Sequence, residues 1–69
     1  MNEVIEHNFQ VGDRVRQHEG SSYYQQSHGC EGTILSIRSR SMFHDNHPIS
    51  VRWDNGHVND YYGHNLYKV

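Results

Sequence analysis

The sequence has little cysteine and no long hydrophobic run. Its single cysteine, Cys30, excludes an internal disulfide framework and a zinc site built from several cysteines, so no oxidising compartment is required. No apolar run approaches the roughly 20 residues that a membrane-spanning helix needs. The first ten residues, MNEVIEHNFQ, lack the apolar segment of a secretory signal. We therefore expect a cytoplasmic protein without a membrane segment.

Basic residues are few and unevenly placed. Six Lys and Arg against eight Asp and Glu give a formal net charge of -2, which argues against nucleic acid as a partner. Five of the six basic residues are arginines, however, and residues 54–67 contain neither Lys nor Arg. One face could therefore be locally positive. The alternative is that the arginines are ordinary solvated strand positions, because small-domain surfaces carry mixed charge. The candidate basic face comprises Arg14, Arg16, Arg38, Arg40 and Arg52.

Apolar residues are also scarce, at 33% of a 69-residue chain. A chain of this length forms one domain that buries only about 60% of the surface exposed by its unfolded form, so its core must be small. One Trp, five Tyr and two Phe are nevertheless too many aromatic residues for a typical disordered tail. We predict one folded domain over residues 11–69. Residues 1–10 precede it, either as an added edge strand or as a flexible extension.

Alternating side chains predict strands separated by polar loops. Residues 11–17, VGDRVRQ, fit a strand that begins near Gly12, and the polar residues 18–29 predict a long loop. Alternation in residues 30–40 predicts a strand with one face made of Thr33, Leu35 and Ile37. Residues 49–54, ISVRWD, predict its partner, with one face made of Ile49, Val51 and Trp53. Because an inward tryptophan would bury more area than any other side chain, we expect Trp53 in the core.

The second half of the chain carries a strong hairpin signal. Asp54-Asn55-Gly56 tolerates positive φ and lies between two alternating segments, which indicates a tight turn. Residues 57–62 then predict a fourth strand, residues 63–65 a turn or a single helical turn, and residues 66–69 a short last strand. Five short strands joined in this way predict an all-β fold, a small five-stranded SH3-like barrel of the Tudor or KOW type.

Segments spread over residues 11–69 resemble the Mib-type repeat of large ubiquitin ligases. The most specific of them is the Trp-Asp-Asn-Gly hairpin, and the long first loop is where the chain departs from the family pattern. The resemblance implies an SH3-like barrel that binds peptide tails of partner proteins. The matching positions are Gly12, Val15, Arg16, Gly32, Thr33, Ile34, Trp53, Asp54, Asn55, Gly56, Asn59, Tyr61, Gly63 and Leu66.

A weaker resemblance points to the KOW motif of ribosomal proteins and transcription elongation factors. It rests on VGDRVR followed by GCEGTILSI, and it implies a barrel that binds RNA or RNA polymerase. KOW motifs usually carry lysines near their central glycine. This chain has Glu31 there, and a carboxylate repels the phosphate backbone that supplies most nucleic-acid affinity.

Several aromatic residues lie where a core does not explain them. Tyr23 and Tyr24 fall in the polar first loop, and tyrosine is favoured in binding surfaces because it offers broad contact at a small entropy cost. Tyr61 and Tyr62 are adjacent, so in a strand one faces the core and the other the surface. We predict either a groove at one end of the barrel or a lid of loop tyrosines over the core. The groove residues would be Tyr23, Tyr24, Phe43, Tyr61 and Tyr62.

The charges near such a groove leave its ligand open. Asp54 and Asp60 beside tyrosines would suit a cationic group, because ring faces attract cations. The arginines Arg38, Arg40 and Arg52 would instead suit a carboxylate or a phosphate, because a guanidinium presents a planar fork of donors.

The seven histidines and the single cysteine give little support for a metal site or an enzyme. Zinc needs about four ligands in fixed geometry, whereas His44 and His47 share one loop without a second paired motif. His28 near Cys30 offers no third group to orient a thiol nucleophile. We therefore expect no metal, no cofactor and no catalysis. Several histidines that titrate together would nevertheless make the net charge sensitive to mild acidification.

These observations favour a binding module that acts alone. We expect it to recognise another protein or a peptide through the aromatic groove, as an inhibitor or an adaptor. The alternative is a KOW-like protein that binds RNA, DNA or a ribonucleoprotein through the arginine face. The two differ in salt dependence, because phosphate binding weakens steeply between about 50 and 200 mM salt.

Overall fold

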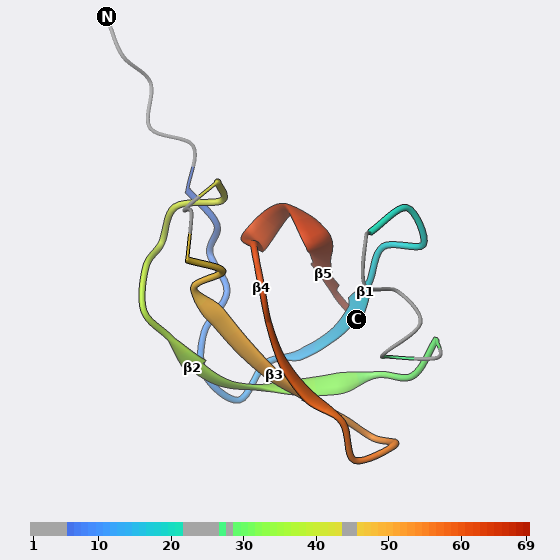
Figure 1. The fold of residues 1–69 in the computed structure, drawn as a ribbon. Coiled ribbons are helices and arrows are strands. Elements are labelled where there is room, and N and C mark those ends of the chain that lie inside the picture. The colour runs from blue at the N-terminus through green and yellow to red at the C-terminus, as the bar shows by residue number, and fades with distance from the viewer. Residues whose placement is uncertain (1–5, 22–26, 28, 44–45) are drawn as a thin grey trace, which may run out of the picture.

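The chain folds as a single antiparallel sheet. The computed structural model describes residues 6–21, 27, 29–43 and 46–69. Within them lie β1 (Arg14–Gln17), β2 (Gly32–Ile37), β3 (Ile49–Trp53), β4 (Val58–Tyr61), the 3-10 helix η1 (Gly63–Asn65) and β5 (Leu66–Lys68). The strand order is β4-β3-β2-β1-β5 (Figure 1). The predicted all-β, SH3-like class is confirmed, and none of the described residues forms a helix long and apolar enough to cross a membrane.

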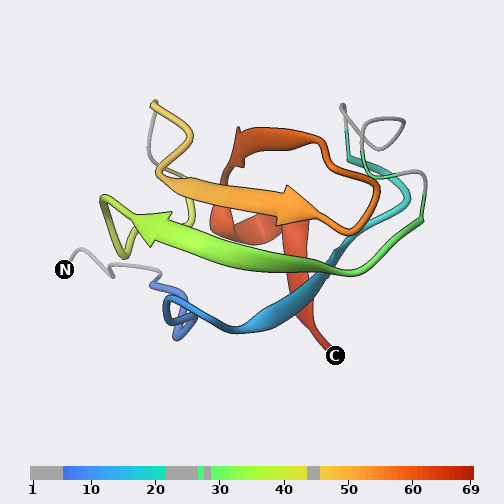
Figure 2. The ribbon, with the colours of Figure 1, turned by 90° about the horizontal axis from the view of Figure 1, so that it is seen from below.

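The sheet bends around its core without closing. β2 and β3 lie side by side, and β5, at the far edge of the bent sheet, runs at a steep angle to them (Figure 2). β4 and β5 are the two edges of the sheet, and η1 connects them. The single helical turn expected at residues 63–65 is thus confirmed, and it brings the last strand back to pair with β1.

The core is small and is built around Trp53. Trp53 is 1% exposed, and its ring lies edge-on to Tyr61 at 5.5 Å. The indole Nε1 donates a hydrogen bond of 2.8 Å to the Tyr61 hydroxyl, so neither buried polar group is left without a partner. The prediction that Trp53 is core is confirmed. The buried apolar residues are Phe9, Val15, Ile34, Ile49, Val51, Trp53, Tyr61 and Leu66.

The predicted face of β2 is wrong at Ile37, because the strand carries an irregularity before that residue. The register with β3 shifts between Ile34 and Ser36, as in a β-bulge, so the alternation of side chains is interrupted. Ile34 is buried and Ile37 packs against the core, while Leu35 is 41% exposed. Thr33 and Leu35 alternate with the buried Gly32 and Ile34 as predicted, whereas Ile37 turns toward the core, so the three residues do not share one face.

The N-terminal side of the fold also differs from the prediction. β1 begins at Arg14 rather than near Gly12, because residues 10–13 form a turn in which Gly12 has a φ of 93°. Phe9 is buried in the core, so part of the predicted extension belongs to the folded domain. The backbone N–H of His7 donates to the Arg40 carbonyl at 3.0 Å, which fixes this segment against the chain beyond β2.

Burial of Tyr61 predicts a loss of stability at alkaline pH. Burial raises the pKa of the Tyr61 phenol, and the hydrogen bond from Trp53 offsets part of this rise. The folded state therefore holds the phenolic proton more tightly than the unfolded state. The resulting stabilisation is complete below the pKa of an unfolded tyrosine, about 10, and it is lost as pH rises toward the folded-state pKa.

Urea unfolding at several pH values from 8 to 11 tests this dependence. Above pH ~10, we expect the free energy of unfolding to fall more steeply in the native protein than in a Tyr61→Phe variant. At neutral pH the variant should lose about 1–3 kcal/mol, because the buried Trp53 N–H has lost its acceptor. Equal alkaline slopes in the two proteins would contradict the prediction.

Candidate functional site

Four aromatic and histidine rings contact one another in a row at the surface. We call Phe43, His64, Tyr62 and His47 the ring strip. His64 stacks on Phe43 with ring centres 4.9 Å apart and on Tyr62 with ring centres 5.3 Å apart. Tyr62 also contacts His47, with ring centres 4.1 Å apart. The strip therefore joins the loop between β2 and β3 to the start of η1.

A hydrogen bond fixes the His64 ring, which lies between Phe43 and Tyr62 in the strip. The Nδ1 atom of His64 lies 2.8 Å from the Met42 carbonyl oxygen. Because a carbonyl can only accept, Nδ1 carries the hydrogen, and in the neutral ring Nε2 is then the acceptor. This bond ties η1 to the loop residue immediately before Phe43.

The other end of the strip is held by Arg38. The Arg38 guanidinium donates to the His47 carbonyl at 2.5 Å and to the Ser50 hydroxyl at 3.2 Å, and it pairs with Asp60 at 3.3 Å. His47 has a φ of 49°, in the left-handed region that non-glycine residues seldom occupy. Strained backbone of this kind persists where the surroundings enforce it, and it is concentrated at functional sites.

The geometry of the stack restricts its chemistry. The ring planes of His64 make angles of only 24° with Phe43 and 13° with Tyr62, and with centres 4.9 and 5.3 Å apart the rings form offset stacks. Aromatic rings are electron-poor at their edges and electron-rich on their faces. The edges of the stacked rings suit carbonyl and carboxylate oxygens, while the offset leaves part of each ring face uncovered by its neighbour.

Two hollows lie near elements that carry the strip. A cavity of about 580 Å³ has no ring-strip residue in its lining, which includes Met42, Gly63 and the segment at residues 6–9. A smaller cavity of about 260 Å³ includes His47 itself in its lining, together with Asn46, Asn59 and Asp60. The strip thus borders the amide-rich hollow directly at its His47 end.

The predicted groove residues are only partly brought together. Phe43, which is 57% exposed, and the half-buried Tyr62 meet through His64. Tyr61 is fully buried, so the prediction that one of the two adjacent tyrosines is core is confirmed, and Tyr61 is not a surface residue of the groove. Tyr23 and Tyr24 lie outside the described residues.

The predicted carboxylates are already engaged by arginines. Asp60 borders the small cavity, but it pairs with Arg38 and accepts a hydrogen bond of 2.6 Å from the Ser50 hydroxyl. Asp54 belongs to a different cluster, where it pairs with Arg14 at 2.6 Å. The sequence suggested Asp54 and Asp60 as partners for a cationic ligand. Both instead pair with arginines of the chain itself.

Sequence reasoning missed two members of the strip, His47 and His64. From the sequence, the histidines were interpreted only as metal ligands or as titrating groups. A histidine ring is also a flat stacking partner, and His64 lies two positions from Tyr62. The contact with Phe43 depends on a loop meeting η1, which no local spacing reveals.

The five arginines do not gather on one face as free charges. Arg14 pairs with Asp54 and Glu31, and Arg16 pairs with Glu31 at 3.5 Å. The hydrogen bond that Arg14 donates to Asp54 lowers the pKa of the Asp54 carboxyl and raises the pKa of the Arg14 guanidinium. Arg38 lies beside the ring strip instead. In the described part of the chain only Arg40 and Arg52, among the five, form no ion pair.

No metal centre is visible in the part of the chain that the structure describes, where no three His, Cys, Asp or Glu side chains come together. His44 lies outside the described residues, so the pair that it forms with His47 in the sequence is not placed. Comparisons of the chain with protein-family models, curated proteins and solved structures found no match.

Proposed function

We propose that the protein is a non-catalytic binding module that recognises another protein or a peptide at the ring strip. The observation that carries this proposal is a stack of rings from two separate elements that is held at the surface rather than in the core. Phe43 remains 57% exposed although it is fully apolar. Aromatic side chains clustered in this way are typical of the centres of protein interfaces.

The form of the site favours an extended peptide. A row of stacked rings with a hollow at its His47 end matches a chain that lays carbonyl oxygens along the ring edges and places a side chain in the hollow. The loop that carries Phe43 and His47 is anchored by Arg38 and by the bond between His64 and Met42. Such anchoring lowers the entropy that must be lost on binding.

The resemblance of the hairpin at residues 53–56 to the Mib-type repeat supports the same assignment, because that family binds peptide tails. We accordingly propose that the protein acts as an adaptor or an inhibitor in the cytoplasm by occupying a partner's surface. The KOW-like alternative gains less support, since Arg14, Arg16 and Arg38 are each paired with a carboxylate.

Affinity capture from the source cell tests the proposal. We expect one defined protein partner, retained after nuclease treatment and reduced at least tenfold by Phe43→Ser or Tyr62→Ser. Tyr67→Ser is the matched control, because Tyr67 is 41% exposed on β5 and does not belong to the strip. A tenfold loss is about 1.4 kcal/mol, an ordinary effect for truncating a central interface residue.

Each other outcome of the capture experiment counts against the proposal. Recovery that disappears with nuclease and is unaffected by the strip variants would move the function to nucleic acid. An equal loss in Tyr67→Ser would show that the strip has no special part in binding. Circular dichroism of all variants must first show that they remain folded.

A further inference from the structure

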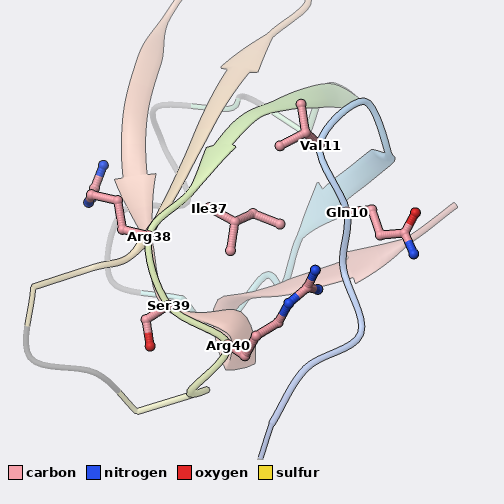
Figure 3. Close-up of a pocket in the computed structure, with 6 residues that line it drawn as sticks. All are labelled: Gln10, Val11, Ile37, Arg38, Ser39 and Arg40. Atoms are coloured by element: carbon pink, nitrogen blue, oxygen red, sulfur yellow. The ribbon is translucent and has the colours of Figure 1, made fainter.

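A cavity of about 590 Å³ lies between the turn at residues 10–13 and the end of β2, and none of its lining residues belongs to the ring strip. Figure 3 shows how its lining side chains are oriented. Those of Val11, Ile37 and Arg40 point into the space between the two chain segments, whereas the others point away. The lining residues are Gln10, Val11, Ile37, Arg38, Ser39 and Arg40.

The apolar wall of this cavity is held in place by backbone bonds. The turn is fixed by the N–H of Gly12, which donates to the Ile34 carbonyl at 2.8 Å, and by two bonds between Gln10 and Asp13. Val11 is nevertheless 63% exposed, so the turn presents it toward Ile37 without burying it. A single exposed valine is ordinary, but here it faces a second aliphatic side chain and a cation.

Among the described residues, no carboxylate compensates the charge in the cavity. Arg40 forms no ion pair with any of them, and the described lining contains no Asp or Glu. One Nη atom of Arg40 donates to the Phe9 carbonyl, which fixes the guanidinium. A guanidinium has five N–H donors in a planar fork, so donors remain for a carboxylate.

We propose that this cavity binds the C-terminal residue of a partner polypeptide. Its α-carboxylate would pair with Arg40, and its aliphatic side chain would pack against Val11 and Ile37. At a chain terminus the negative charge and the aliphatic group belong to one residue, whereas Asp and Glu carry the charge without that group. Phosphate lacks the apolar part, and a long acyl chain would need more apolar wall than two side chains provide.

Titration of the full chain with a short peptide, followed by NMR, tests the proposal. The probe is acetyl-Ala-Ala-Ala-Leu with a free carboxylate. We expect saturable shifts of the Arg40 side-chain N–H and of the Val11 and Ile37 methyl groups. The C-terminal amide of the same peptide should bind at least about tenfold more weakly, because hydrogen bonds to charged groups are the strong ones.

Three variants separate the site from general effects. Arg40→Gln should weaken binding at least about tenfold. Val11→Asp should do the same, and since Val11 is largely exposed this variant keeps the fold. Arg52→Gln is the matched control and should bind normally, because Arg52 is likewise exposed and without an ion pair in the described chain. Phe43→Ser should also bind normally, since this site is separate from the ring strip.

The proposal is overturned if the amide binds as well as the free carboxylate, or if no shift saturates. It is also overturned if inorganic phosphate produces the same shifts, which would indicate a simple anion site. Tighter binding of octanoate than of the peptide would assign the cavity to a fatty acid instead. Equal weakening by Arg52→Gln would show that Arg40→Gln weakens peptide binding only by changing the net charge.

Discussion

Replacing Gly32 with alanine is expected to lower the free energy of unfolding by about 3 kcal/mol or more. A Cβ atom at this position would lie 2.5 Å from Cε3 of Trp53, 2.8 Å from Cγ1 of Val51 and 2.9 Å from the Arg52 carbonyl oxygen. Side chains of the core cannot move far in a close-packed interior, and the carbonyl belongs to the paired strand β3. The methyl group therefore forces β2 and β3 apart.

Urea unfolding followed by circular dichroism measures this loss. The matched control is Gly20→Ala, because a Cβ atom at Gly20 meets nothing within 4 Å. We expect the control to change the free energy of unfolding by less than about 1 kcal/mol. If Gly32→Ala were as stable as the control, β2 and β3 could not pack as closely as described.

Replacing Trp53 with alanine is expected to cost about 3–5 kcal/mol. The change removes the largest fully buried side chain and leaves the Tyr61 hydroxyl without its indole donor. Domains are stabilised by roughly 0.05–0.15 kcal/mol per residue, so for a chain this short the loss is comparable with the total stability. The variant should therefore be largely unfolded at 25 °C.

The dispersion of methyl signals in the proton NMR spectrum, together with circular dichroism, reports this unfolding without needing the tryptophan itself. Val58→Ala is the control, because Val58 is 56% exposed on the edge strand β4. It should stay within about 0.5 kcal/mol of the native protein. A folded Trp53→Ala variant with dispersed methyl signals would contradict the central place of Trp53 in the core.

Regular alternation made part of the fold predictable. Ile49, Val51 and Trp53 are apolar at every second position between a proline and a turn, so the strand and its inward face followed directly. Ile37 was wrongly placed on the face of Thr33 and Leu35, because the register shift arises from how β2 meets β3 and not from the composition of β2. Phe9 was missed as a core residue because one apolar side chain in a polar segment has no periodicity.

The candidate site was less predictable than the fold. The adjacency of Tyr61 and Tyr62 showed that one of them faces the core, but choosing between them requires the register of β4 with β3. Phe43 was predicted as a groove residue, yet its stacking partner His64 is distant in sequence. The engagement of Asp54 and Asp60 by arginines is a tertiary property as well, because each pair joins different parts of the chain.

The strand order also bears on when the chain can fold during its synthesis. β2, β3 and β4 follow one another along the chain and pair as they emerge, so they can form early. β1 instead needs both β2 and β5, and Val15 pairs with Lys68. Contacts between residues so far apart form slowly, because a long loop must close first. We expect one side of β1 to stay unpaired until residues 66–68 have left the ribosome.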